Sequence, residues 1–79
     1  MTKEVLLTRI AATITTLAET NGSPESTIYL AFGSNIHEWE ILRDVLVKAG
    51  LVKISGNYVT LTAEGKVKAV QLEALIKKN

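Results

Sequence analysis

Residues 42–65 read LRDVLVKAGLVKISGNYVTLTAEG, and the fold depends on this stretch because the spacing of its apolar residues changes at Gly50. Before Gly50 the apolar residues recur every three or four positions, which indicates one face of a helix. After it, residues 51–55 and 58–62 form two short runs rich in β-branched and aromatic side chains. Gly56 and Asn57 join these runs as a turn suited to positive φ. The stretch therefore predicts a helix followed by a β-hairpin whose register is set by that turn.

Two helices are predicted ahead of this stretch. The first spans residues 2–19 with Thr2 as its N-cap, and its apolar residues share one face: Leu7, Ile10, Ile14 and Leu17. Asn21 and Gly22 supply the left-handed conformation that ends it. The second helix spans residues 24–32, with Ser23 as N-cap and Pro24 as first helical residue, and Gly33 closes it. Its inner face is formed by Ile28, Ala31 and Phe32.

The third predicted helix spans residues 36–49 and carries two different faces. Asn35 is placed to cap it, and Glu38 has the capping-box spacing at which a carboxylate returns to the N–H of the capping residue. The core-facing side is formed by Trp39, Leu42, Val45, Leu46 and Ala49. The opposite, outward side is formed by Ile36, His37, Glu40, Arg43, Asp44 and Val47.

The last predicted helix spans residues 63–77, capped by Thr62, and it is apolar on two sides. One stripe is formed by Ala63, Val67, Val70 and Ala74, while Leu72, Leu75 and Ile76 fall outside it. One small domain cannot cover both sides, so we expect the second set to form a homodimer interface. The alternative is that these side chains are simply exposed on a frayed terminal helix.

The composition is that of one folded domain, residues 1–79, with 47% hydrophobic and 22% charged residues. There is no cysteine, so disulfides and thiolate metal sites are excluded. The first residues lack the long apolar stretch of a signal peptide or a membrane span, and we expect a cytoplasmic protein with no membrane partner. The net charge of +1 offers little attraction for nucleic acid.

The residues that carry out most enzyme chemistry are not grouped in this sequence. His37 is the only histidine, so no histidine pair can bind a metal, and the five glycines lie at element ends rather than in a phosphate-binding loop. The serines occupy cap and turn positions without a partner base. We therefore expect no enzyme activity, no metal and no cofactor.

Residues 42–65 resemble the winged-helix superfamily of small transcription regulators. The shared features are a leucine four residues before a glycine, an apolar pair after it, a hairpin wing, and a Leu-Thr-x-x-Gly signature that opens the last helix. Here they are Leu46, Gly50, Leu51 and Val52, the hairpin with Tyr58 in its second strand, and residues 61–65. The resemblance implies a mainly α domain with a small β-hairpin, in the order helix, helix, helix, strand, strand, helix. It also implies that residues 36–49 are the recognition helix of a helix-turn-helix and that the hairpin is the wing.

If the resemblance extends to function, the partner is double-stranded DNA and the protein is a transcription regulator. Arg43 would then read a base, while the other contacts would position the helix or the wing on the backbone: Ser34, Asn35, His37, Lys48, Lys53 and Asn57. Glu40 and Asp44 on the same face oppose this hypothesis because carboxylates repel phosphates. The alternative is a protein-interaction module without DNA binding, which uses the acidic and apolar outward side of residues 36–49.

Overall fold

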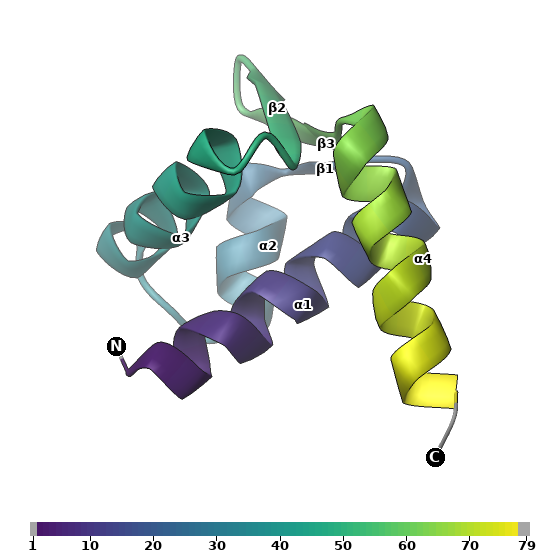
Figure 1. The fold of residues 1–79 in the computed structure, drawn as a ribbon. Coiled ribbons are helices and arrows are strands. Elements are labelled where there is room, and N and C mark those ends of the chain that lie inside the picture. Colours follow the sequence, from purple (N-terminus) through teal and green to yellow (C-terminus); the bar gives the residue numbers. More distant parts are fainter. Residues whose placement is uncertain (1, 78–79) are drawn as a thin grey trace.

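The structure is a computed structural model that describes the backbone of residues 2–77 and the side chains of residues 2–75. These residues form a mainly helical domain with a small antiparallel sheet (Figure 1). The helices are α1 (Lys3–Thr20), α2 (Glu25–Ala31), α3 (Ile36–Lys48) and α4 (Ala63–Lys77). The strands are β1 (Ser23–Pro24), β2 (Val52–Ser55) and β3 (Tyr58–Leu61), in the sheet order β1-β3-β2. The predicted mainly α class is confirmed, and each predicted helix is present, but the predicted element order lacks β1.

The hairpin of β2 and β3 has the predicted register. Ser55 pairs with Tyr58 and Ile54 with Val59, so Gly56 and Asn57 form the turn. Gly56 has a φ of 62°, while Asn57 keeps a negative φ. In this turn only the first of the two central residues has a positive φ. Glycine is favoured at that residue because a Cβ would be strained there.

The prediction that Ser23 caps α2 and that Pro24 is its first residue is wrong. Ser23 and Pro24 form β1, which pairs with Val59 and Tyr58 of β3, and α2 begins at Glu25. Gly22 makes this pairing possible, since a Cβ built on it would lie 2.7 Å from the Tyr58 ring and 3.1 Å from the Val59 carbonyl oxygen. Proline suits an edge strand because it has no N–H to donate.

Helix α1 crosses the middle of the molecule, with α3 and α4 on either side and the hairpin at one end (Figure 1). The core is formed where these elements meet, by Ile14, Leu17, Ile28, Trp39, Leu42, Leu46, Val52, Val59 and Ala69. The predicted inner face of α1 is wrong at Leu7, which is exposed, because Leu6 packs against the core instead. Ala31 and Ala49 are likewise exposed rather than core-facing.

The predicted inner stripe of α4 is wrong, and of the set expected to be left over only Leu72 lies on the inward side among the described side chains. The inward side is formed by Gly65 and Ala69, which are buried, and by the half-buried Leu72. The stripe of Ala63, Val67, Val70 and Ala74 is exposed instead. Leu75 is exposed as predicted, and the side chain of Ile76 lies outside the described residues. No helix within residues 2–77 is both long enough and apolar enough to cross a bilayer.

Thr62 joins the end of α3, the hairpin and the start of α4. Its Oγ1 donates to the Gly50 carbonyl oxygen at 2.6 Å and accepts from the Gly65 N–H at 3.0 Å, which confirms it as the cap of α4. Its own N–H donates to the Leu51 carbonyl oxygen at 3.0 Å. A Cβ on Gly65 would collide with that same carbonyl. The Leu-Thr-x-x-Gly signature therefore has a structural reason in this chain.

Candidate functional site

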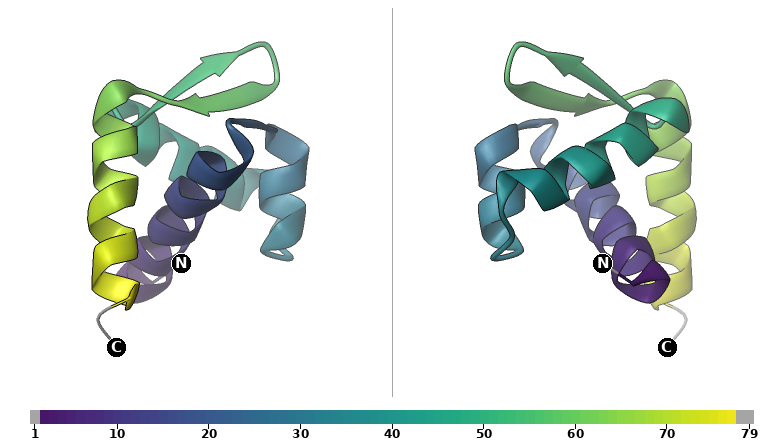
Figure 2. Two further views of the ribbon diagram at one scale, coloured as in Figure 1. Left: turned by 90° about the vertical axis from the view of Figure 1, so that its right-hand side faces the viewer. Right: turned by 90° about the vertical axis from the view of Figure 1, so that its left-hand side faces the viewer.

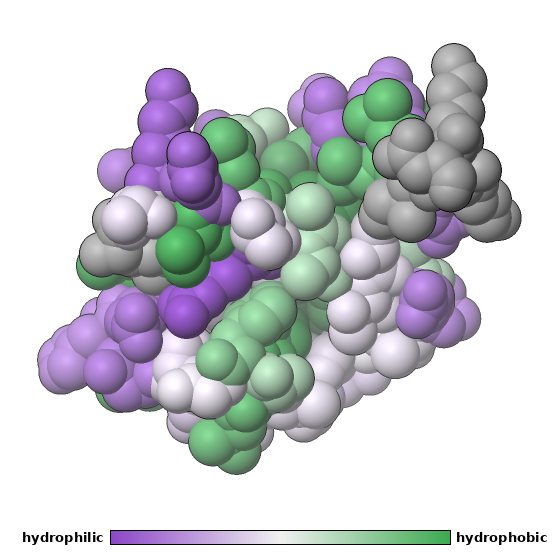
Figure 3. Space-filling view, turned by 90° about the horizontal axis from the view of Figure 1, so that it is seen from below, coloured by the Kyte–Doolittle hydropathy of each residue, from purple (hydrophilic) through white to green (hydrophobic). Residues whose placement is uncertain are grey.

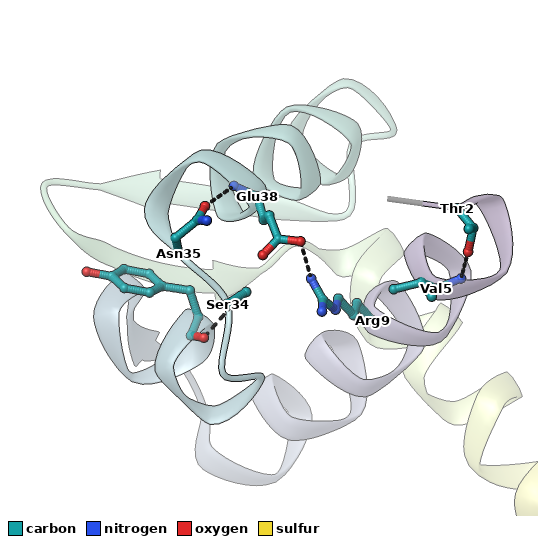
Figure 4. A network of polar contacts seen from close by, with 7 residues as sticks. Thr2, Val5, Arg9, Ser34, Asn35 and Glu38 are labelled. Atoms are coloured by element: carbon teal, nitrogen blue, oxygen red, sulfur yellow. Dashed lines mark hydrogen bonds and ion pairs between the residues drawn. The ribbon is translucent and has the colours of Figure 1, made fainter.

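The turn between α2 and α3 is held by the two polar residues before α3. The Asn35 Oδ1 accepts from the Glu38 N–H at 3.0 Å, which confirms Asn35 as the N-cap (Figure 4). The Ser34 hydroxyl donates to the Tyr29 carbonyl oxygen at 3.1 Å. Each side chain therefore has a structural partner within the domain, and Asn35 is exposed at the start of α3.

The carboxylate of Glu38 does not complete a capping box, so that prediction is wrong. It lies 3.4 Å from the Arg9 guanidinium of α1 (Figure 4). Arg9 also lies over the Phe32 ring, 5.8 Å from its centroid. Glu38 therefore pairs with Arg9 rather than with the N–H of Asn35, and the charge of Arg9 is balanced within the domain.

The carboxylate of Glu25, the first residue of α2, is the centre of a small network against α3. Its Oε1 accepts from the indole Nε1 of Trp39 and from the guanidinium of Arg43, each at 2.9 Å. The side chains of Glu25 and Arg43 are only 18% and 32% exposed. Arg43 thus bridges α3 to α2, and the charge that the DNA hypothesis assigns to base reading is already paired.

The network shifts the pKa of both partners. Partial burial by itself raises the pKa of Glu25, but the hydrogen bonds from Trp39 and Arg43 and the charge of Arg43 outweigh it, so the pKa lies below its usual value. The hydrogen bond to Glu25 raises the pKa of Arg43, against the smaller effect of burial. Both shifts favour the charged forms, so the ion pair is intact at neutral pH.

The outward side of α3 is left with aliphatic and acidic side chains. The aliphatic ones are Ile36, Ile41 and Val47, which are 50%, 55% and 46% exposed. The exposed charged or titratable ones are Glu40, Asp44, Lys48 and His37. We call these seven residues the α3 surface. At neutral pH it holds two carboxylates and one ammonium group, so it is slightly acidic.

Ile41 is the member of this surface that sequence reasoning missed. It belongs to neither of the two sides assigned to residues 36–49. Helical spacing nevertheless places it beside His37 and Asp44, three or four residues away on the outward side. A large exposed aliphatic residue between polar neighbours was the available signal.

The hairpin adds little charge to this surface. Lys53 is exposed on β2, and the tip formed by Ser55, Gly56 and Asn57 is exposed without a charged group. The backbone carbonyl of Asn57 accepts from the Glu25 N–H at 2.8 Å, which fixes the tip against the start of α2. Of the predicted DNA contacts, five are exposed: Asn35, His37, Lys48, Lys53 and Asn57.

Known proteins offer no identification. Neither the profiles of known protein families, nor curated proteins, nor solved structures gave a match. Within the described part of the chain, no group of three or more histidine, cysteine, aspartate or glutamate side chains is placed to hold a metal ion. The α3 surface, where three exposed aliphatic side chains lie among two carboxylates, is the candidate site.

Proposed function

We propose that this chain is a winged-helix domain that acts as a protein-interaction module, with the α3 surface as its binding site. The order of α2, a tight turn, α3 and a hairpin supports the winged-helix assignment. The observation that carries the functional part is the Glu25 network, because it occupies Arg43 and leaves an acidic, aliphatic surface outward.

The charges of this surface favour a protein partner over DNA. Binding to phosphates draws on lysine and arginine side chains, roughly one for each phosphate neutralised. On α3 and the hairpin the unpaired cations among the described residues are Lys48 and Lys53, against the carboxylates of Glu40 and Asp44. DNA entering this surface would therefore meet repulsion along the middle of α3.

The partner that fits this surface is a basic amphipathic segment of another protein. Ile36, Ile41 and Val47 offer apolar contact, and such partly exposed aliphatic residues gain most when an apolar side chain covers them. Glu40 and Asp44 lie among them and would pair with lysine or arginine on the incoming segment. Recognition of an amphipathic helix by an apolar surface with complementary charge is a common mode of binding.

Photo-crosslinking from the α3 surface tests this proposal. Ile41 is replaced by a photoreactive phenylalanine analogue in the native cells, and adducts are compared with those of the same analogue at Glu19, an exposed position on α1. We expect a protein adduct from position 41 that is absent from position 19 and is lost in the Glu40→Lys, Asp44→Lys double variant. An adduct from position 41 that nuclease removes would instead support DNA binding, and a protein adduct indifferent to the double variant would contradict the proposal.

A further inference from the structure

Exposed apolar side chains occur on several elements, but on α4 they form a continuous row. Elsewhere they are single, as with Leu7 on α1 and Leu30 on α2, or lie among charged side chains, as on the α3 surface. The face of the molecule seen from below shows apolar and polar side chains next to one another (Figure 3). On α4 the row is Ala63, Val67, Val70 and Ala74, with Val67 59% and Val70 68% exposed. Its spacing of four, three and four residues is that of the seam of a coiled coil.

The other side of α4 is already occupied, so the row is a separate surface. Gly65, Ala69 and Leu72 hold α4 against α1 and β3 on the inward side. Helix α4 lies at one edge of the molecule, below the hairpin, in both views of Figure 2. In Figure 1 it lies on the opposite side of α1 from most of α3. A partner on the row would therefore leave the α3 surface accessible.

A hollow runs along each side of the row. One, of about 560 Å³, lies between α4, α1 and β3, with Lys66, Val70 and Glu73 on its α4 wall. The other, also of about 560 Å³, lies between α4 and the segment after α3, and its α4 wall includes Glu64, Val67 and Gln71. A ridge between two hollows accepts a second ridge of the same shape, because side chains beside each ridge fill the hollow of the other.

We propose that two copies of this chain associate through α4 in an antiparallel, two-fold symmetric pair. In this register Val67 of each copy packs against Val70 of the other, and Ala63 against Ala74. In this register the small alanines meet at the ends and the valines at the centre, so the row is complementary in size to itself. An isologous contact of this kind closes as a dimer.

The charges beside the row select this arrangement. With Val67 opposite Val70 of the second copy, Lys66 lies beside Glu73 of the second copy, and symmetry repeats the pair. Glu64 lies beside Gln71 of the second copy in the same way. Within one chain Lys66 and Glu73 are seven residues apart, about two helical turns, and so do not pair with each other. A parallel arrangement would match the sizes of the row equally well, but it would leave Lys66 and Glu73 of the two copies about two helical turns apart and so lose the pair.

The dimer proposed here replaces most of the interface expected from the sequence. Leu72 belongs to the inward side of α4, so it is not available to a second copy. Leu75 is exposed, and in the antiparallel register it comes level with the hollow that Ala49, Leu51 and Ala63 line in the second copy. One helix pair buries less than a standard interface, so we expect a dissociation constant in the micromolar range.

Sedimentation equilibrium of the full chain, over about 5 to 500 µM, measures the association directly. We expect monomer and dimer in exchange, and Val70→Glu should weaken the dimer at least about tenfold because it places two carboxylates in the apolar seam. Leu30→Glu on α2 is the matched control, since Leu30 is 67% exposed and Val70 68%. A chain that stays monomeric at the highest concentration, or a dimer that Val70→Glu leaves unchanged, would overturn the proposal.

Charge reversal and disulfide trapping test the direction of the pair. Lys66→Glu alone should weaken the dimer about tenfold, and adding Glu73→Lys should restore it to within about threefold, because the pair is re-formed with its signs exchanged.

Disulfide trapping is the second test of direction. The chain has no cysteine, so Val67→Cys and Val70→Cys chains can be mixed and oxidised. A disulfide between the two variants is expected, and disulfides that join only like variants would show a parallel pair and overturn the proposal.

Discussion

Gly65→Ala is expected to destabilise the domain severely, although alanine normally stabilises a helix relative to glycine by up to about 1 kcal/mol. The reason is local, since a Cβ on Gly65 would overlap the Leu51 carbonyl and lie 3.0 Å from the Leu61 side chain. That carbonyl accepts from the Thr62 N–H, so it cannot move without breaking the junction of hairpin and helix. We expect a loss of about 3 kcal/mol in the free energy of unfolding.

Thermal and urea unfolding followed by circular dichroism measures this loss. For a domain of this size, about 3 kcal/mol corresponds to a fall of at least roughly 12 °C in the melting temperature. Gly33→Ala is the matched control, because nothing lies within 4 Å of its Cβ position and only its φ of 64° carries a cost, about 1 kcal/mol. A Gly65→Ala protein as stable as the parent would show that α4 does not pack so closely on Leu51.

Glu25→Ala is expected to cost about 2 kcal/mol of unfolding free energy at pH 7, because it leaves the Trp39 indole N–H and the Arg43 guanidinium without their shared acceptor. Both hydrogen bonds reach a charged oxygen, which makes them stronger than neutral ones. Because the side chains of Glu25 and Arg43 are partly exposed, the expected loss of unfolding free energy lies below the losses typical of fully buried ion pairs. Urea titration at pH 7 measures the difference.

Loss of the Glu25 carboxylate also predicts a change in how stability depends on pH. The pKa of Glu25 is lower in the folded protein than in the unfolded chain, so its carboxylate stabilises the fold above the unfolded pKa. That contribution is lost as the pH falls through the folded pKa. The difference between parent and Glu25→Gln should therefore be present at pH 7 and shrink below about pH 4. Glu40→Gln, on the exposed side of α3, is the control and should change the free energy of unfolding by less than about 0.5 kcal/mol at pH 7 and at low pH. An equal effect of Glu25→Gln and Glu40→Gln would contradict the role of the Glu25 network.

The hairpin and the helices were predictable because local chemistry decides them. Gly56 and Asn57 fix the turn, Asn35 and Thr62 cap their helices, and Asn21 ends α1 in the left-handed conformation with a φ of 59°. Each of these signals acts within four residues of the chain. Tertiary packing has little opportunity to override them.

The side of a helix that faces the core was less predictable. On α1, Leu6 and Leu7 are adjacent, and the sequence pattern fits either as the inward residue. On α4, two rows have helical spacing: the exposed row of Ala63, Val67, Val70 and Ala74, and the inward row of Gly65, Ala69 and Leu72. The close approach to Leu51 that Gly65 allows determines which row faces inward, and this contact joins residues fourteen positions apart.

The candidate site depended on contacts that no local pattern reveals. Glu25 binds partners that are 14 and 18 residues away in the sequence, so the pairing of Arg43 could not be anticipated. Sequence reasoning did identify Glu40 and Asp44 as a reason to weigh a protein partner against DNA. The fold favours the protein partner, because Arg43 is paired with Glu25 and Ile41 is exposed beside the carboxylates.

Titration of the ¹⁵N-labelled domain with random duplex DNA at low salt, followed by NMR, tests the α3 surface most directly. Low salt strengthens any contact to phosphates, so the condition favours DNA. We expect no clustered chemical-shift changes in residues 36–48 or 53–58, because Arg43 is held by Glu25 and the outward carboxylates repel phosphates. Changes confined to these residues, reversed by added salt, would show that the surface binds DNA and would contradict its role as a protein-binding site.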